Sequence, residues 1–466
     1  MMTKTELTHF VATAVSAVLV SHALAAQPNV VLIFADDAGY HDFGFQGNAA
    51  FEQVTPNIDS IAHDGVVVER AYVTASVCSP SRAGLLTGRY QQRFGFENNL
   101  PGLWNTGGSS AWTDGTWETW GLDLDERTLG DRMKDAGYQT ALIGKWHQGL
   151  ADHHHPNARG FDRFFGIVGG SRHFFPYTET YSEAFVYGEY NLTNAIFDQR
   201  TPVVEDGYVT DRFGEEAVEF IRSAADDDQP FFLYLSYTAP HTPMHATGED
   251  RAWATEHFPE LSGKRLAYIA MMKAMDDSVG DVLEALAAEG VDDETVVVFF
   301  NDNGGSIKNA SDNTPLRGYK WGPFEGGYRV PMAVRWPGVA KPGGRLAMPV
   351  STLDLTPTLL SAARADQRDT LELDGVDITE WLRAPGDATS DRVLFWRESN
   401  REGRVRVALE YPWRLVLSDR DQPRLFRVDK DPSETRNLAD EHPSRVREMT
   451  ASIEAWEAEL EEPRWH

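Results

Sequence analysis

The sequence predicts an α/β protein: a large mixed, mostly parallel sheet sandwiched by helices, followed by a smaller C-terminal antiparallel sheet with one helix. Two observations support this fold class. Four short runs are apolar throughout, which is typical of strands buried on both faces, and segments with helical spacing of apolar residues separate them. Beyond about residue 386, shorter strand-like segments alternate with turns. With 466 residues, 41% of them hydrophobic, the chain can bury a core of this size.

The predicted strands of the large sheet are rich in β-branched and aromatic residues. They are residues 30–34 (VVLIF), 140–143 (TALI), 231–237 (FFLYLSY) and 295–300 (TVVVFF). Helices are expected over residues 129–136, 212–225 and 263–288. The C-terminal sheet is predicted from residues 393–396, 405–409, 413–417 and 424–428, with a charged helix over residues 443–460.

The N-terminus has the pattern of an export signal. Lys4 precedes an apolar run over residues 10–20, and a small-residue cleavage site follows at residues 23–25. The run is shorter than the roughly 20 residues that a transmembrane helix needs. We therefore expect a signal peptide over residues 1–25, an exported protein that is periplasmic or secreted, and no membrane span. The division of the remaining chain is expected to be an α/β catalytic domain over 26–385 and a C-terminal subdomain over 386–466.

The charge balance excludes one class of partner. The chain has 43 basic and 71 acidic side chains and a net charge of −28, so it lacks the basic surface that nucleic-acid binding requires. It also contains a single cysteine, Cys78, which cannot form an internal disulfide.

Polar residues follow each of the four predicted strands. They are Asp36 and Asp37, then Lys145 and His147, then His241, then Asp302 and Asn303. In an open parallel sheet, ligands bind beyond the carboxyl ends of the strands. Any one of these groups is explained by a turn or a helix cap. The four groups together favour a shared site.

The candidate metal ligands are all oxygen donors. Asp36, Asp37, Asp302 and Asn303 offer carboxylate and amide oxygens, without a cysteine or a histidine pair among them. Hard oxygen ligands of this kind suit Ca²⁺ or Mg²⁺ rather than Zn²⁺.

Several motifs now identify a resemblance. Cys78 begins CSPSR, which is followed by LTGR, and the chain also contains GKWH, APHTP, the block NTPLRGYKWGPFEGGYRVP (residues 313–331) and the tail LFRVDKDPSETRNLA (residues 425–439). In kind and in order these resemble the type I, formylglycine-dependent sulfatases of the alkaline phosphatase superfamily. The resemblance extends from Asn29 to about Pro331, with the tail in addition, and it implies the hydrolysis of sulfate esters.

The resemblance also implies that Cys78 is a precursor. In the family this cysteine is oxidised to formylglycine, by a formylglycine-generating enzyme or by an anaerobic sulfatase-maturating enzyme. The aldehyde hydrates to a geminal diol, one hydroxyl attacks sulfur, and deprotonation of the other expels sulfate. A serine or an unmodified cysteine lacks the second hydroxyl and would remain as a stable ester. The family's metal is Ca²⁺, in preference to Mg²⁺, and Cys78 completes the ligand set of Asp36, Asp37, Asp302 and Asn303.

The roles of the other residues follow from the same resemblance. Arg82 helps to hold the formylglycine and the metal site, and Lys145 and Lys320 bind sulfate oxygens. His147 deprotonates the hemiacetal. His241 lies near the leaving oxygen and is the candidate general acid, with Lys320 assisting. The residues expected to line the substrate pocket are Ser171, Arg172 and His173, together with Lys145, His241 and Lys320.

Two alternatives remain open at the level of sequence. One is a phosphate ester or phosphonate monoester hydrolase of the same superfamily, and the other is a non-catalytic glycan-binding homologue. The expected substrate is a sulfated carbohydrate, whose sugar and sulfated position the sequence does not assign. Two further motifs are interpreted as surface features: the run His153-His154-His155 as an exposed loop, and Asp276 and Asp277 as solvent-facing positions of a helix.

Overall fold

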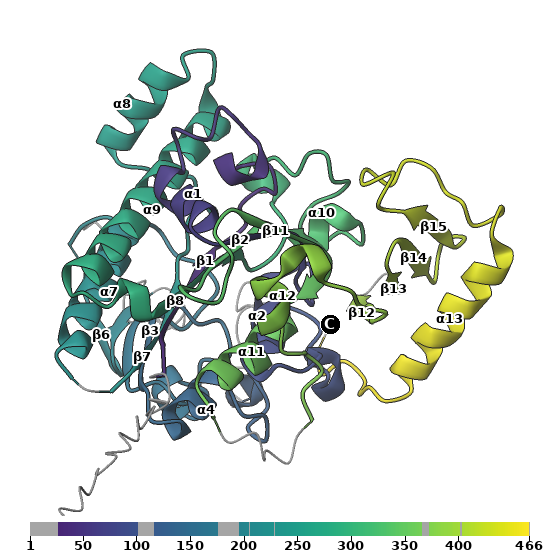
Figure 1. Cartoon of the computed structure of the whole chain (residues 1–466), viewed down its shortest axis with the longest axis horizontal. Helices are drawn as coiled ribbons and strands as arrows, with labels where there is room; N and C mark the ends of the chain where they lie inside the picture. The colour runs from purple at the N-terminus through teal and green to yellow at the C-terminus, as the bar shows by residue number, and fades with distance from the viewer. Residues whose placement is uncertain are drawn as a thin grey trace, which may run out of the picture.

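A computed structural model describes residues 27–100, 116–175, 195–204, 206–227, 229–365, 372–400 and 403–465. The predicted signal peptide therefore lies outside the described residues. The fold class is confirmed: the chain forms one large mixed sheet between helices and a separate four-stranded antiparallel sheet (Figure 1). None of the described helices combines the length and the apolar composition that crossing a membrane requires.

The centre of the large sheet is parallel. β1 (Asn29–Ala35) lies between β8 (Thr295–Asn301) and β7 (Phe231–Ser236), and β3 (Gln139–Lys145) and β4 (Arg163–Ile167) continue the parallel order beyond β7. Every residue of β1, β7 and β8 is buried. Both faces of these strands are covered, which is why their sequences read as unbroken apolar runs.

The edges of the large sheet make it mixed. On one side, β10 (Met332–Arg335) runs antiparallel to β8 and to β2 (Val66–Tyr72), and β11 (Gly344–Ser351) runs parallel to β2. The remaining strands are antiparallel and short: β5 (Ile196–Asp198), β6 (Thr201–Val203) and β9 (Arg329–Val330).

Helices cover both faces of this sheet, and β1 shows how the core is divided. Its side chains alternate between two apolar clusters, with Val31 and Ile33 in one and Leu32 and Phe34 in the other. The first cluster is covered by α1 (Pro56–His63), α7 (Val209–Ala225), α8 (Gly248–His257) and α9 (Gly263–Ala288). The second is covered by α2 (Cys78–Thr87), α4 (Leu129–Asp135), α11 (Leu355–Ala362) and α12 (Thr379–Arg383).

Short helical turns complete the chain between these elements. One is α10 (Glu325–Tyr328). The 3₁₀ turns are Gly44–Gln46, Gln91–Phe94, Thr116–Thr119, Pro156–Ala158, Asp292–Glu294, Ile307–Asn309, Thr352–Asp354 and Pro385–Asp387.

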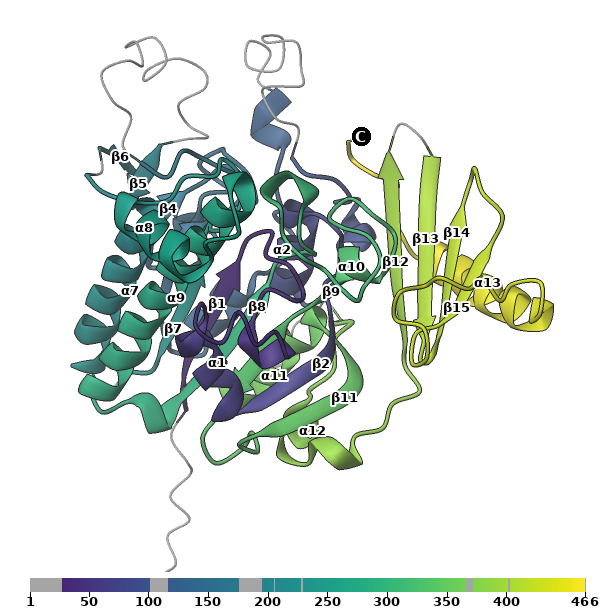
Figure 2. The ribbon, with the colours of Figure 1, turned by 90° about the horizontal axis from the view of Figure 1, so that it is seen from above.

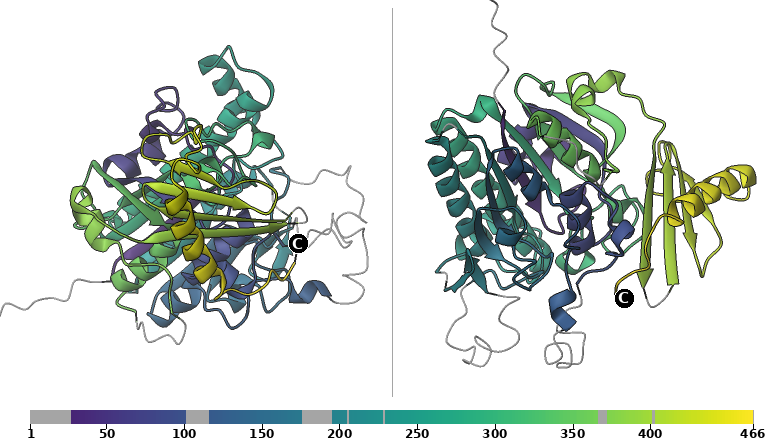
Figure 3. Two further views of the ribbon diagram at one scale, coloured as in Figure 1. Left: turned by 90° about the vertical axis from the view of Figure 1, so that its right-hand side faces the viewer. Right: turned by 90° about the horizontal axis from the view of Figure 1, so that it is seen from below.

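The second sheet lies beside the first (Figure 2). Its strands pair in chain order: β12 (Val393–Asn400), β13 (Gly403–Glu410), β14 (Trp413–Ser418) and β15 (Arg424–Arg427). One face packs against the main body, where the Trp396 ring lies 5.2 Å from that of Tyr328. The helix α13 (Pro443–Glu457) covers the other face (Figure 3). The division of the chain at residues 385 and 386 remains a prediction.

Two surface interpretations are each wrong in part. Asp277 is exposed, as predicted, but Asp276 is not. Asp276 is fully buried in α9, where its carboxylate accepts hydrogen bonds from the backbone N–H groups of Asn57 (3.1 Å) and Ile58 (2.8 Å) at the start of α1. It therefore ties two helices together. His154 and His155 are also buried, and the carbonyl of His154 accepts a hydrogen bond from Trp146 Nε1. Of this run, only His153 is exposed.

One buried carboxylate gives the fold a measurable pH dependence. Asp59 of α1 is 4% exposed and accepts hydrogen bonds from the Phe45 N–H (2.9 Å) and from Thr55 Oγ1 (3.3 Å). Burial raises the pKa of Asp59 from 3.8 to about 6, against the opposing effect of these donors. Between pH 3.8 and about pH 6, the Asp59 carboxyl therefore keeps its proton in the folded state but has released it in the unfolded state. The stabilising effect of that proton is complete below pH 3.8 and is lost as the pH rises through 6.

We therefore expect Asp59→Asn to remove this pH dependence. As the pH rises from about 5 to about 7.5, the wild type should lose about 1 kcal/mol of unfolding free energy that the variant does not lose. Urea denaturation of both proteins across this range measures the difference. A difference that stays constant with pH would contradict the assignment of a raised pKa to Asp59.

Candidate functional site

The parallel strands bring the predicted residues to one edge of the sheet. Asp36 and Asp37 follow β1, Lys145 ends β3, and Asp302 follows β8. Backbone hydrogen bonds continue past the strand ends, from Asp302 N to Ala35 O (3.1 Å) and from Asp36 N to Ala239 O (2.9 Å). These bonds fix the loops after β1, β7 and β8 against one another, so side chains far apart in the sequence meet at the carboxyl edge.

Cys78 lies in the middle of this group, at the first position of α2. It is 1% exposed, its Sγ accepts a hydrogen bond from Lys320 Nζ (2.9 Å), and it lies 3.7 Å from Asp36 Oδ1. Burial raises the pKa of the thiol to about 12, although Lys145 and Lys320 lower it. The thiol is therefore neutral at physiological pH and is a poor nucleophile in its unmodified form.

Three carboxylates pair with three cations around Cys78. Lys145 Nζ donates to Asp36 Oδ2 (2.6 Å) and Lys320 Nζ donates to Asp37 Oδ1 (2.6 Å). The Arg82 guanidinium donates twice to Asp302 Oδ2, at 2.7 and 3.0 Å. The side chains of the Lys145–Asp36 and Arg82–Asp302 pairs have no exposed surface, and those of Lys320 and Asp37 are 7% and 4% exposed.

The cations keep the two neighbouring aspartates ionised. Burial raises the pKa of both Asp36 and Asp37, but nearby positive charge outweighs that effect. For Asp36 the main opposing group is Lys145, and for Asp37 it is Lys320. The net pKa of each carboxyl lies below its ordinary value, so each offers a charged oxygen to a cation.

Two residues of the site have backbone conformations that side chains rarely adopt. Asp37 has φ 66° and His147 has φ 60°, both in the left-handed region. Such a conformation costs on the order of 1–3 kcal/mol and persists where surrounding contacts impose it. Here the Asp37 carbonyl accepts from Asn309 Nδ2 (3.0 Å), and the His147 carbonyl accepts from Ser79 Oγ (2.6 Å) and Gln148 Nε2 (2.8 Å).

The two histidines differ in their surroundings. Burial lowers the pKa of His147 well below its ordinary value, and the positive charges of Lys145, Arg82 and Lys320 lower it further, so the ring is neutral. The Nδ1 of His147 has no hydrogen-bond partner among the described residues, which leaves it free to accept a proton. The Nδ1 of His241 lies 2.6 Å from the Thr242 carbonyl and therefore carries the hydrogen, which directs Nε2 towards Asp37 Oδ2 at 3.6 Å.

The donor set fits a divalent cation. Asp36, Asp37, Cys78 and His241 each present one potential ligand atom, all within 4.8 Å of one another. Asp302 and Asn303 lie beside this group, and each has a buried Oδ1 without a hydrogen-bond partner in the part of the chain that the structure describes. An unpartnered buried oxygen is destabilising unless something binds it. Because these are hard oxygen donors, the fit is to Ca²⁺ or Mg²⁺, with Asn303 Oδ1 and Asp302 Oδ1 available to it.

The three predicted pocket residues are Ser171, Arg172 and His173. They belong to the segment after β4, whose Gly170 approaches the His147 ring so closely that a Cβ there would lie 2.6 Å from Nε2. Arg172 is buried, and its Nε donates to the His173 carbonyl (2.7 Å). The His173 ring lies 5.1 Å from that of His245, which follows His241 in the same loop. Ser171 is half-buried. The contact of these three residues with a substrate remains a prediction.

Sequence reasoning missed several supporting residues. Ser236 Oγ accepts a hydrogen bond from Arg82, and the buried Asn309 donates to the carbonyls of Asp37 and Pro240. Ser236 was visible as the one small polar residue in an apolar strand. Asn309 has no comparable signal, because its role depends on the path of the loop after β8, which brings it back to the site.

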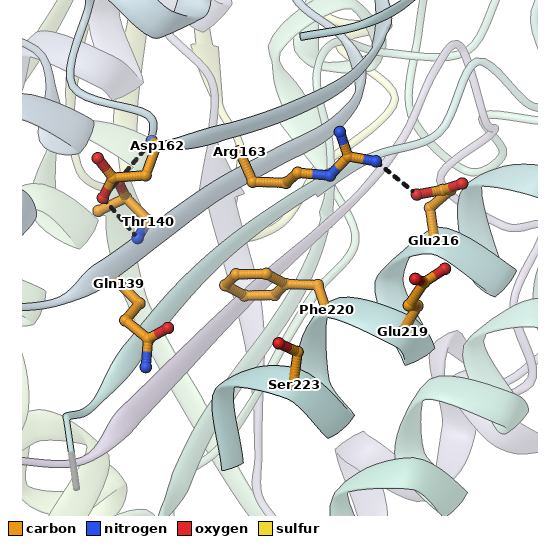
Figure 4. Close-up of a pocket in the computed structure, with 8 residues that line it drawn as sticks. All are labelled: Gln139, Thr140, Asp162, Arg163, Glu216, Glu219, Phe220 and Ser223. Carbon is orange, nitrogen blue, oxygen red and sulfur yellow. Dashed lines mark hydrogen bonds and ion pairs between the residues drawn. The ribbon is translucent and has the colours of Figure 1, made fainter. Parts of the chain in front are cut away.

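A cavity of about 420 Å³ lies at the amino ends of β3 and β4, away from the candidate site (Figure 4). It is lined by the first residues of β3 and β4 and by α7. Four of its polar side chains are paired with one another: Asp162 with Thr140, and Arg163 with Glu216. None of the predicted catalytic residues lines it, so we assign the candidate site to the carboxyl edge instead.

Comparisons with known proteins bear on the family to which the chain belongs. The sequence profile of the family described as Sulfatase matches residues 28–365. Arylsulfatase J of Mus musculus is 32% identical over 369 residues, which cover 77% of this chain and 57% of that protein. N-acetylgalactosamine-6-sulfatase of Rattus norvegicus is 33% identical over 380 residues, covering 80% and 68%. This chain thus spans a little over half of the first protein and about two thirds of the second.

A solved structure matches over nearly the whole chain. The structure of Ps i-CgsB in complex with k-i-k-neocarrahexaose has a TM-score of 0.86 and 34% sequence identity, covering 94% of this chain and 95% of that one. The profile covers most of the described chain, and the relatives exceed 30% identity over more than two thirds of it. The chain therefore belongs to the sulfatase family of the alkaline phosphatase superfamily.

Proposed function

We propose that this protein hydrolyses sulfate esters of a glycan, with a formylglycine derived from Cys78 and a Ca²⁺ ion. The observation that carries the proposal is the position of Cys78: a buried, neutral thiol at a helix N-terminus, within hydrogen-bond distance of Lys320 and beside Asp36. A thiol in this form has little use as a nucleophile. As the precursor of an aldehyde, Cys78 is well placed. It begins α2, whose N-terminus favours anions, and it lies beside the charged side chains of Lys320 and Asp36.

The charge balance of the cluster around Cys78 suits an anionic substrate. Asp36, Asp37 and Asp302 are balanced by Arg82, Lys145 and Lys320, so a bound dication would leave the cluster with a net positive charge. A sulfate monoester carries a single negative charge and would be attracted to it. Lys145 and Lys320 are the donors proposed to bind sulfate oxygens, exchanging part of their contact with Asp36 and Asp37 for the ester.

The proposed acid and base follow from the two histidines. When present, the hydrated formylglycine supplies one hydroxyl that attacks sulfur and a second whose deprotonation releases sulfate. His147 is the proposed base, since its ring is neutral and its Nδ1 is unpartnered among the described atoms. His241 is the proposed acid at the leaving oxygen, since its Nε2 faces the cluster, 3.6 Å from Asp37 Oδ2.

The proposed metal is Ca²⁺, in preference to Mg²⁺. Asp36, Asp37, Asp302 and Asn303 would hold it together with the group formed from Cys78. Bound there, the ion would withdraw charge from the sulfate oxygens and lower the pKa of a coordinated hydroxyl. Arg82 would keep Asp302 in place through its two hydrogen bonds to Oδ2, which leave Oδ1 without a contact to the guanidinium.

The proposed substrate class is a sulfated polysaccharide, with a carrageenan oligosaccharide as the first compound to test. The solved relative that matches 94% of this chain contains a neocarrahexaose. Ser171, Arg172 and His173 are proposed to contact the sugar, from the segment that packs on His147. We further propose that the protein is exported and is periplasmic or secreted. A formylglycine-generating enzyme or an anaerobic sulfatase-maturating enzyme is proposed to convert Cys78.

A pair of aryl esters tests the proposed reaction. The protein, produced with a maturation enzyme, should hydrolyse an aryl sulfate at a kcat/KM well above that for the matching aryl phosphate. Cys78→Ala should lower turnover by at least about a thousandfold, because the nucleophile is lost, while the circular dichroism spectrum is unchanged. Asp59 lies outside the candidate site, so the Asp59→Asn variant is the control and should hydrolyse the aryl sulfate as the wild type does.

The opposite results would decide against the proposal. Faster turnover of the phosphate would favour a phosphate ester or phosphonate monoester hydrolase. An absence of turnover on aryl and glycan esters, with Cys78 fully converted, would favour a non-catalytic glycan-binding protein. Retained activity in Cys78→Ala would refute the role of this residue.

Thermal unfolding with and without Ca²⁺ tests the proposed metal site. Adding Ca²⁺ to the chelator-treated protein should raise the midpoint of thermal unfolding by a few degrees, because the ion binds only the folded state. Asp37→Asn should lose most of this increase, since it removes one charged ligand. Asp59→Asn is again the control and should keep the full increase. An equal response of all three proteins to Ca²⁺ would place the ion elsewhere.

A further inference from the structure

The C-terminal tail motif contains a residue that the proposed chemistry does not use. Glu434, in DPSETRNLA, is fully buried although it lies in a turn after β15. Its backbone has φ 48°, in the left-handed region that a side chain seldom occupies. A strained, buried carboxylate in a turn indicates that specific contacts hold it there.

Those contacts are with the loop that carries Lys320, which we define as residues 313–327. Glu434 Oε2 accepts a hydrogen bond from the backbone N–H of Glu325 (2.7 Å), at the start of α10. The Glu434 carbonyl accepts from Arg317 Nη1 (2.9 Å), and the adjacent Ser433 Oγ donates to the Pro315 carbonyl (2.5 Å). The tail thus contacts the Lys320 loop on both sides of Lys320.

Arg414 of β14 joins the same interface. Its guanidinium pairs with Glu434 Oε1, donates to the Pro323 carbonyl (2.5 Å) and lies 3.4 Å from Glu325 Oε1. Arg414 and Glu325 have no exposed side-chain surface. Arg329 pairs with the second oxygen of Glu325 at 3.4 Å. The two arginines and two glutamates therefore form one buried network. Burial raises the pKa of Glu434 to about 7, although Arg414 lowers it.

The Lys320 loop depends on such contacts because little regular structure holds it. Apart from the short helix α10, it is held by individual backbone hydrogen bonds, among them Lys320 N to Gly305 O (3.0 Å) and Trp321 N to Ser76 O (3.1 Å). Asn313 Nδ2 lies within hydrogen-bond distance of three carbonyl oxygens, those of Gly318 and Gly326 inside the loop and that of Gly305 outside it. A displacement of this loop would move the Lys320 ammonium away from Asp37 and Cys78.

We propose that Glu434 is a positioning residue, which together with Arg414 holds the Lys320 loop so that the Lys320 ammonium faces Cys78. The inference rests on the proposed function for the catalytic importance of Lys320, whereas the positioning itself can be tested without turnover. The C-terminal sheet is then a structural part of the site, because Arg414 belongs to it and Glu434 directly follows it.

Removing the Glu434 charge should release the loop. Arg414 remains protonated at every accessible pH, so Glu434→Gln leaves the buried guanidinium with Glu325 as its remaining carboxylate partner. The guanidinium would then compete for Glu325 and for solvent, which loosens the start of α10. Glu434→Ala should loosen it further, because it also removes the acceptor for the Glu325 N–H.

The test measures the accessibility of Lys320. Acetic anhydride labels exposed amines, and mass spectrometry gives the labelling rate of each lysine. In the wild type, Lys320 (7% exposed side chain) and Lys145 (no exposed surface) should both be protected. In Glu434→Gln, the rate at Lys320 should rise at least about threefold while that at Lys145 stays unchanged, because Lys145 is held by β3 and not by the loop.

The matched control is Asp354→Asn. Asp354 is likewise fully buried, accepts a backbone hydrogen bond from Ser351 N (2.8 Å) and pairs with an arginine, Arg392, which precedes β12. It makes no contact with the Lys320 loop among the described residues, so its loss should leave the labelling of Lys320 unchanged. If Glu434→Gln does not fold, Arg317→Ala tests the same link from the exposed side of the loop and should raise Lys320 labelling in the same direction.

Three results would overturn the proposal: unchanged labelling of Lys320 in these variants, an equal rise at Lys145, or an equal rise in Asp354→Asn. With an active wild type, Glu434→Gln should also lower kcat/KM by about tenfold, through a misplaced Lys320, and Asp354→Asn should not. An inactive wild type would refute the proposed function, whereas the labelling results would still decide whether Glu434 positions the loop.

Discussion

The structure depends on a balanced set of buried charges at the carboxyl edge of its central sheet. Asp36, Asp37 and Asp302 pair with Lys145, Lys320 and Arg82, largely out of contact with water. Burying a single charge without a partner is strongly unfavourable, so each of these groups requires the others. Because the side chains come from strand ends, a loop and a helix, their pairing also fixes how those segments meet.

This constraint connects the two sheets. The large sheet delivers the carboxylates directly from the ends of β1 and β8, where hydrogen bonds between the strands set their spacing. Lys320 instead comes from a loop, which a second balanced charge cluster at Glu434 and Arg414 supports from the C-terminal part of the chain. One set of pairs therefore holds the residues of the candidate site, and the other holds the segment that carries one of them.

The sequence predicted the parts of this arrangement that local patterns encode. The central strands were recognisable because burial on both faces makes them apolar throughout, and the residues after them were placed by the geometry of a parallel sheet. The strand β2 was missed because its run VVVERAY includes two charged residues. Asp276 was misassigned to the surface because its partners at the start of α1 lie more than about 200 residues away. The same reason hides Asn309 and Glu434, whose roles exist only once distant segments have packed together.

The central claim is that Cys78 is the precursor of the reactive group rather than the group itself. The mass of the peptide that contains Cys78, taken from protein made in a host with a maturation enzyme, tests this claim most directly. Conversion to formylglycine predicts a mass about 18 Da below that of the cysteine form, through the loss of H₂S and the gain of oxygen. An unmodified thiol in protein that hydrolyses sulfate esters at full rate would contradict the account.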